Sequence, residues 1–223
     1  MRRLGLETSD DTSSVAVVCD GRLHAEDSFC SRLVLCDELM PRILRILDSD
    51  LSLDGIAVSS GPGSFTGLRI GVTTAKALGH ALEVPVVGVP TQPVLALSCG
   101  AEAANVAVVQ KARVGYVCAG VHAVKGDTVA EQVPVQLVAH EQLYEMIRNA
   151  DLVTGNGLAE AAGSDQRLGE LEVVAPPDDV ARASVVLKLA QWPQRYSFEQ
   201  VAALRPQYIL QSQAERTHGI RID

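Results

Sequence analysis

A glycine-rich turn at residues 59–71 constrains the fold of this chain more than any other segment, because a strand leads into it and a long helix leads out. The entering residues 55–58 are apolar and partly β-branched, which is typical of a buried strand. Gly61 and Gly63 allow backbone angles that a side chain would forbid, and Pro62 stiffens the turn between them. The segment therefore predicts a strand, a tight turn and a helix start.

The first helical residues indicate what this turn can bind. Ser64 or Thr66 is suited to cap the free amides of the first turn, and such a turn can hold an anion. A P-loop, however, requires Lys and then Ser or Thr after its last glycine, whereas Leu68 and Arg69 follow Gly67. We therefore exclude a P-loop. Two interpretations stay open, an anion site and a turn whose glycines serve its geometry alone.

The helix expected at residues 67–82 has three chemically different faces. One face is small at every fourth position and would admit a closely packed neighbour: Gly67, Gly71, Ala75 and Gly79. A second face is apolar, and the narrow polar stripe consists of Arg69, Thr73, Lys76 and His80. Most of the helix is therefore expected to be buried. Its small face is expected to receive another helix, which can come from this chain or from a partner. The alternative is ordinary packing of this face within the chain.

The composition is that of a globular protein with an acidic surface. The 223 residues are 47% hydrophobic, which is enough for one large or two small packed cores. The formal net charge of −8 opposes non-specific attraction to nucleic acid. The five cysteines include no C-x-x-C pair, and no apolar run has the length of a membrane span. We therefore expect a soluble cytoplasmic protein with no membrane partner.

The same order of elements occurs twice along the chain. Three strands, a helix and a strand precede the first glycine turn, and the same order from residue 105 precedes a second turn at residues 154–157. This recurrence predicts an internally duplicated α/β fold. We expect two subdomains, residues 1–100 and 101–223, each with a mixed β-sheet and helices.

No catalytic constellation stands out in the sequence. The histidines lack the H-x-x-x-H spacing of metal ligands, and Ser64 does not lie in a G-x-S-x-G elbow. We therefore predict neither a catalytic residue nor a metal site. Asp10 and Asp11 follow the first strand and can face a magnesium ion, although their interpretation as ordinary hairpin-turn residues is favoured. Together with Gly61 and Gly63 they are the candidate nucleotide-proximal residues.

The glycine turn also carries a family resemblance. Residues 61–71 read GPGSFTGLRIG, and with AKAL at 75–78 and VPVVGV at 84–89 they closely resemble the TsaB (YeaZ) family. Further similarity lies in LETS at residues 6–9, LMP at 39–41 and PQYIL at 206–210. The resemblance spans nearly the whole chain and is weakest at about residues 164–181. Glu7 is one departure, because the family usually has Asp there.

The resemblance implies the duplicated fold of actin-like ATPases and sugar kinases. It also implies a role in making N6-threonylcarbamoyladenosine beside the anticodon of tRNA, as a noncatalytic subunit that dimerises with and supports the TsaD transferase. A TsaE-like ATPase is the further partner implied, and tRNA an indirect one. The resemblance implies that the chain alone binds no cofactor. It also implies that ATP or ADP binds with magnesium at the interface of the complex. TsaD-like proteins carry H-x-x-x-H where residues 90–95 read PTQPVL, which agrees with a noncatalytic role.

The resemblance also places a partner interface on the first two helices, through which the family pairs. The positions carried over are Leu35, Leu39, Ile43, Leu68, Gly71, Val72, Ala75 and Leu78. Without its partner such a surface is expected to form a homodimer, because large apolar patches rarely stay exposed. The substitution Gly71→Arg is then expected to block pairing while the chain stays folded. The alternative is a stand-alone ATP-using enzyme of the actin and sugar-kinase type, and a metallopeptidase ranks third for want of ligands.

Overall fold

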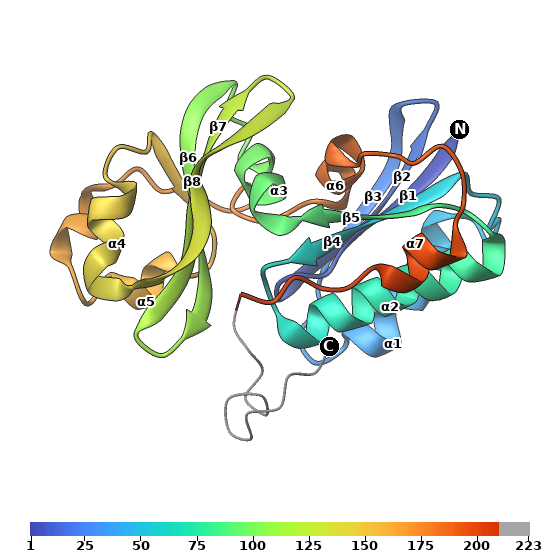
Figure 1. Cartoon of the computed structure of the whole chain (residues 1–223), viewed down its shortest axis with the longest axis horizontal. Helices are drawn as coiled ribbons and strands as arrows, with labels where there is room; N and C mark the ends of the chain where they lie inside the picture. The colour runs from blue at the N-terminus through green and yellow to red at the C-terminus, as the bar shows by residue number, and fades with distance from the viewer. Residues whose placement is uncertain (210–223) are drawn as a thin grey trace.

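The computed structural model describes residues 1–209, which form two β-sheets with helices packed against them (Figure 1). The first sheet has the strand order β3-β2-β1-β4-β5. It is mixed, because β1 pairs antiparallel with β2 and parallel with β4. The elements of this unit are β1 (Arg2–Glu7), β2 (Thr12–Cys19), β3 (Arg22–Cys30), α1 (Leu35–Ile46), β4 (Gly55–Gly61), α2 (Phe65–Leu82), β5 (Val86–Pro90) and α3 (Thr91–Ser98).

The second sheet repeats this arrangement with the order β8-β7-β6-β9. Here β6 pairs antiparallel with β7 and parallel with β9. Its elements are β6 (Ala103–Arg113), β7 (Tyr116–Lys125), β8 (Thr128–Ala139), α4 (His140–Ile147), β9 (Leu152–Thr154), α5 (Leu158–Ala161) and the 3-10 helix η1 (Gln166–Glu170). The recurrence confirms the predicted duplicated α/β fold.

The two glycine turns occupy equivalent places in the two sheets. A Cβ built on Gly63 would lie 2.5 Å from the carbonyl oxygen of Ser9, just past the end of β1. In the second sheet, a Cβ built on Gly155 would lie 2.5 Å from the carbonyl oxygen of Val109 in β6. Each turn therefore needs glycine because the neighbouring strand or its end passes directly against it.

Helix α2 begins as predicted and packs its small face within the chain. The Ser64 hydroxyl caps the helix by accepting a hydrogen bond from the backbone amide three residues further on, at 3.2 Å. A Cβ built on Gly71 would lie 2.0 Å from the hydroxyl oxygen of Thr8, and one on Gly79 would lie 2.2 Å from a methyl group of Val86. The small face therefore lies on the helix's own sheet, and no partner helix from residues 1–209 occupies it.

The last described part of the chain returns to the first sheet. Helix α6 (Ala183–Leu189) packs on β1, β2 and β4, while α7 (Phe198–Ala203) packs on α2 and β5 (Figure 1). The apolar residues of α6 share a buried cluster with residues of β2 and β4. Helices α6 and α7, which belong to the predicted second subdomain of residues 101–223, thus bury apolar surface on the first sheet. Leu210, the end of the predicted tail motif, lies outside the described residues.

Residues 192–209, here called the C-terminal strap, lie along the polar stripe predicted on α2. The Lys76 ammonium group donates hydrogen bonds to the carbonyl oxygens of Ala202 and Leu204, at 2.7 and 3.1 Å. Nδ1 of His80 lies 2.9 Å from the Tyr196 hydroxyl. The polar stripe thus serves an intramolecular contact that satisfies backbone carbonyls of the strap.

Candidate functional site

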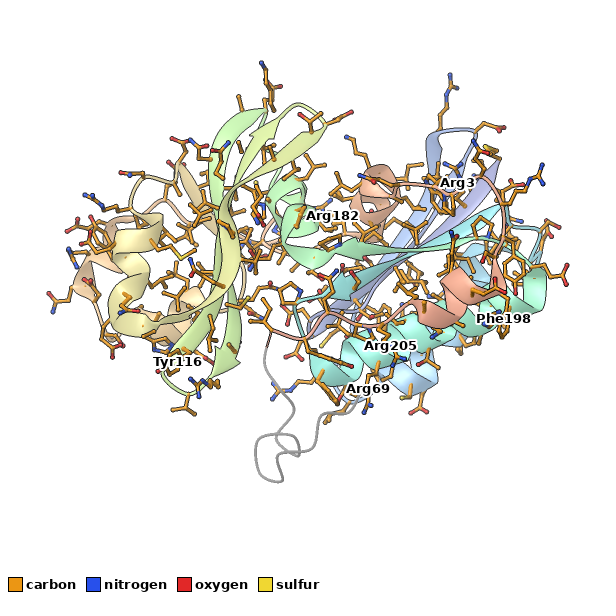
Figure 2. The ribbon with its side chains drawn as sticks, viewed as in Figure 1. Arg3, Arg69, Tyr116, Arg182, Phe198 and Arg205 are labelled. Carbon is orange, nitrogen blue, oxygen red and sulfur yellow. The ribbon has the colours of Figure 1, made fainter. Side chains whose placement is uncertain are left out.

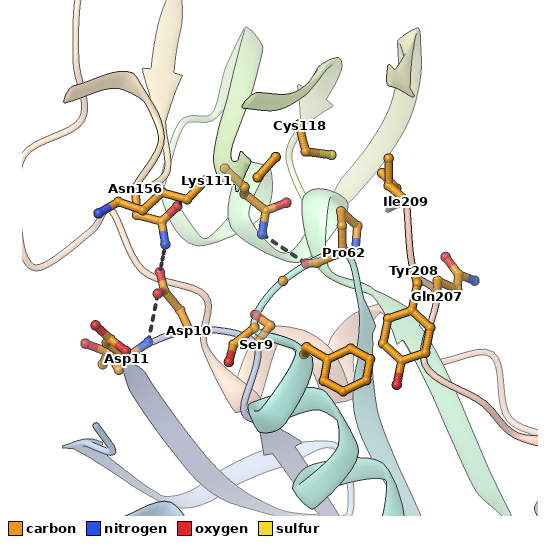
Figure 3. Close-up of a pocket in the computed structure, with 16 residues that line it drawn as sticks. Ser9, Asp10, Asp11, Pro62, Lys111, Cys118, Asn156, Gln207, Tyr208 and Ile209 are labelled. Atoms are coloured by element: carbon orange, nitrogen blue, oxygen red, sulfur yellow. Dashed lines mark hydrogen bonds between the residues drawn. The ribbon is translucent and has the colours of Figure 1, made fainter. Parts of the chain in front are cut away.

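A cleft of about 750 Å³ lies between the two sheets, where the ends of their first strands meet (Figure 3). Its walls come from the turn after β1, the glycine turn before α2, the ends of β6 and β7, the turn after β9 and the C-terminal strap. Both halves of the duplicated fold therefore contribute to one hollow, which is where small ligands commonly bind in proteins.

Asp10 and Asp11, two of the candidate nucleotide-proximal residues, line this cleft. Oδ2 of Asp10 accepts a hydrogen bond from the Asn156 side-chain amide at 2.8 Å, which ties the two subdomains together across the cleft (Figure 3). Oδ1 of Asp10 accepts from the Asp11 backbone amide at 2.7 Å. Asp10 therefore acts as a structural link between the two halves of the fold.

The two candidate glycines differ in position. Gly63 lines the cleft, whereas Gly61 is buried beneath the C-terminal strap. Gly61 has a φ of 111°, and a Cβ built on it would lie 2.5 Å from the carbonyl oxygen of Gln207. The neighbouring carbonyl of Pro62 accepts a hydrogen bond from the Gln110 side chain at 3.0 Å. Three of the four predicted residues thus meet in one cleft, and the fourth supports it from beneath.

The residues of the cleft do not fit the phosphate groups of a nucleotide. Of the backbone amides at the start of α2, that of Ser64 already donates to the carbonyl of Ser9 at 2.7 Å, and that of Gly67 donates to the Ser64 hydroxyl at 3.2 Å. The Lys111 ammonium group lies 3.2 Å from the carboxylate of Glu160. With two carboxylates alongside, little positive charge remains to bind an anion. Nucleotide at an interface with a second chain stays a prediction.

Glu7 lies at the end of β1 beside the cleft and is fully buried. Its Oε1 accepts a hydrogen bond from the Ser9 amide at 2.7 Å, while Oε2 has no partner among residues 1–209. Burial raises the pKa of Glu7, and the hydrogen bonds from Ser9 and Ser59 only partly offset this effect. A buried carboxyl with a raised pKa carries its charge poorly and is unsuited to bind a metal ion on the surface.

The positions carried over to a partner interface are buried within the chain. None of the seven side chains among them is more than 9% exposed, and Gly71 is buried as well. Those of α1 and α2 point into the core between these helices and the sheet. These positions lie on the face of each helix that the chain itself covers, and their part in a partner interface stays a prediction of the resemblance. Gly71→Arg would therefore be expected to disturb the core as well as any pairing.

Another face of the same two helices is exposed and carries no charge. We call this surface the uncharged seam, and on it the exposed or half-buried positions recur every three or four residues. It consists of Leu33, Cys36, Met40 and Leu44 on and just before α1, and of Thr66, Ile70, Thr73, Ala77 and Ala81 on α2. Leu33 is 97% exposed. Sequence reasoning missed these residues, although their helical spacing and lack of charge were readable.

Neither a metal site nor a membrane span is found in the part of the chain that the structure describes. Among residues 1–209, no three His, Cys, Asp or Glu side chains are grouped so as to hold a metal ion. None of the helices in that range combines the length and the apolar character needed to cross a bilayer.

Comparisons with known proteins agree with this architecture. The family model described as TsaD, tRNA N6-adenosine threonylcarbamoyltransferase, matches residues 35–210. The tRNA threonylcarbamoyladenosine biosynthesis protein TsaB of Bacillus subtilis is 31% identical over 155 residues, 68% of each chain. A tRNA N6-adenosine threonylcarbamoyltransferase of Geotalea uraniireducens is 31% identical over 109 residues, 40% of this chain and 32% of that protein. The solved structure of YeaZ from Pseudomonas aeruginosa superimposes with a TM-score of 0.73 at 23% identity, covering 93% of this chain and 99% of that one.

The fold and the surface define a duplicated α/β protein with an uncharged seam exposed on two adjacent helices. The extent of the matches in sequence then shows that the chain belongs to the TsaB (YeaZ) family, whose members resemble the TsaD transferases.

Proposed function

We propose that this chain is a noncatalytic subunit in the synthesis of N6-threonylcarbamoyladenosine in tRNA, and that it docks a TsaD-like transferase through the uncharged seam. The seam is the observation that carries this proposal. In a chain of net charge −8, in which 21% of residues are charged, nine exposed or half-buried positions on two adjacent helices bear no charge. The buried centres of protein interfaces are depleted of charge in the same way.

The nature of the partner follows from the resemblance between the two families. A TsaD-like chain has the fold of this one, so its first two helices can meet the seam about an approximate twofold axis. The outer face of α2 carries the small side chains of Thr66, Thr73 and Ala77, so a partner helix can approach its backbone closely. The same geometry permits two copies of this chain to pair when no transferase is present. A TsaE-like ATPase and tRNA would then join the complex, in the cytoplasm, through the transferase.

A substitution on the seam tests this docking. Ala77→Arg places a charge at the centre of the α2 face, and the matched control Ala159→Arg alters an exposed alanine of α5, the equivalent helix of the second subdomain. Ala77→Arg should abolish co-purification with the TsaD-like partner and tRNA modification in a reconstituted reaction, while Ala159→Arg leaves both intact. Normal pairing by a folded Ala77→Arg variant would show that the partner docks elsewhere.

The alternative of a stand-alone ATP-using enzyme has less support, because amides at the start of α2 are already bonded within the chain. Its test is ATP turnover by the purified chain, with Asp11→Asn as the comparison. A rate that disappears in the variant would favour the enzyme over the docking subunit.

A further inference from the structure

Two arginine–aromatic stacks flank the opening of the cleft, one on each subdomain. On the first, the Arg69 guanidinium lies 4.6 Å from the centre of the Phe65 ring, and the centre of the Tyr208 ring lies 4.9 Å from that of Phe65. Phe65 and Tyr208 line the cleft, yet these residues remain 42% and 44% exposed. Such a degree of exposure is unusual for large aromatic residues and leaves flat surfaces available to a ligand.

The second stack lies on the hairpin between β6 and β7. The Arg113 guanidinium lies 4.0 Å from the centre of the Tyr116 ring. Tyr116 is two residues before Cys118 on the same strand, so both lie on one face of β7, and Cys118 lines the cleft. Figure 2 shows Tyr116, Arg69 and Arg205 along the same lower side of the molecule. Arg113 directly follows Lys111 and Ala112, which line the cleft, and we call the two stacks the lips of the cleft.

These two stacks differ from two others that serve structure. Arg42 lies over Phe29 and is held by carboxylates of Asp27 and Glu38, at 2.8 and 3.1 Å. Arg167, over Tyr144, is likewise held by Asp165 and Glu145. Within residues 1–209, by contrast, neither Arg69 nor Arg113 forms an ion pair, and both are exposed. Their positive charge is thus available to a ligand.

We propose that these two lips bind single-stranded RNA. The exposed rings of Phe65 and Tyr208 and the half-buried ring of Tyr116 would stack on unpaired bases, and the guanidinium groups of Arg69, Arg113 and Arg205 would contact phosphates. Asp10 and Asp11 line the cleft and repel phosphate, so the strand would lie across the lips with its backbone outward. The net charge of −8 disfavours binding elsewhere on the surface, which confines the strand to this opening. This RNA-binding proposal does not depend on the docking proposal, because the RNA site needs no partner chain.

Fluorescence anisotropy with a short, unstructured, fluorescein-labelled RNA and the purified full chain tests the proposal. Tyr208→Leu should weaken binding at least about fivefold while Tyr208→Phe keeps it, because the ring and not the hydroxyl stacks on the base. Arg69→Ala should weaken binding and reduce the dependence on salt by about 0.7 in the log–log slope, the value for one lost phosphate contact on a single strand. The matched control Arg167→Ala removes an ion-paired stack and should change neither quantity.

Three results would overturn the proposal: no RNA binding by the wild-type chain, equal losses in Arg69→Ala and Arg167→Ala, or competition by a polyglutamate peptide as effective as that by unlabelled RNA. The last result would identify an acidic protein as the ligand. Ala77→Arg should bind RNA like the wild type, so failure of the docking proposal and failure of this one are distinguishable.

Discussion

The hydroxyl of Thr8, just past the end of β1, lies where a side chain on Gly71 of α2 would begin, 2.0 Å from the position of its Cβ. No real Cβ contact is this short, so the helix can lie on the end of the strand only because residue 71 is glycine. This contact fixes the height of α2 above the sheet. It thereby positions both the glycine turn beside the cleft and the uncharged seam on the outer face.

Gly71→Ala is therefore expected to destabilise the chain by about 1–3 kcal/mol, the usual cost of overpacking a core. Urea denaturation measures the change in the free energy of unfolding. In the Thr8→Ala background the penalty should become smaller, because the hydroxyl and methyl groups nearest to the new Cβ are gone. Gly163→Ala is the control, since a Cβ there meets no atom within 4 Å among the described residues. Equal effects at residues 71 and 163 would contradict the account of packing.

Glu7→Gln is expected to stabilise the chain at about pH 8 and to have little effect in acid. Burial raises the pKa of Glu7 above its ordinary value of 4.5, so the wild type is most stable when this group is protonated and loses stability as pH rises. Gln has the same shape but no charge, and its oxygen can still accept from the Ser9 amide. Urea denaturation across the pH range gives the difference. A difference that is constant with pH would show that the charge of Glu7 is not the cause.

His122 should make the wild-type chain sensitive to acid. Its side chain is 1% exposed, and burial lowers its pKa below the ordinary value of 6.5. Nε2 lies 3.2 Å from the Gln92 side-chain oxygen, in the contact between β7 and α3. Because the unfolded chain takes up the proton first, stability should fall as pH drops below about 6.5. His122→Gln should lose this dependence, whereas a substitution of the exposed His24 should keep it. Melting temperatures from pH 5 to 8 provide the comparison.

Sequence patterns predicted local structure well because local structure depends on neighbouring residues. The turn between β4 and α2, its Ser64 cap and the repeated order of elements all follow from short-range rules of glycine, capping and periodicity. Asp10, Asp11 and Gly63 met in one cleft because turns after equivalent strands lie at the same edge of a sheet.

The surface was harder to predict, because burial depends on residues far away in the sequence. Leu39 and Met40 are both apolar, and only packing against the sheet decides that the first is buried while the second stays half-exposed. Lys76 and His80 were predicted only as part of a polar stripe, and the sequence did not indicate that they bind a strap that lies more than 100 residues further along the chain. The return of α6 and α7 to the first sheet is of the same kind, and short-range periodicity carries no signal for it.

Exchanging Asp10 and Asn156 should test the link across the cleft. Asn156→Asp alone sets two carboxylates against each other where the structure has a hydrogen bond of 2.8 Å, so it should destabilise the chain and loosen the two subdomains. Adding Asp10→Asn restores a hydrogen bond across the cleft, because the new side-chain amide at position 10 can donate to the new carboxylate at position 156. That carboxylate can also accept from the Lys111 backbone amide, as the Asn156 side chain does. The double variant should therefore recover about 0.5–3 kcal/mol of unfolding free energy relative to the sum of the single changes. Limited proteolysis of the segments between the subdomains provides a second measurement, because a loosened cleft exposes them. Purely additive effects would show that the two side chains do not interact across the cleft in solution.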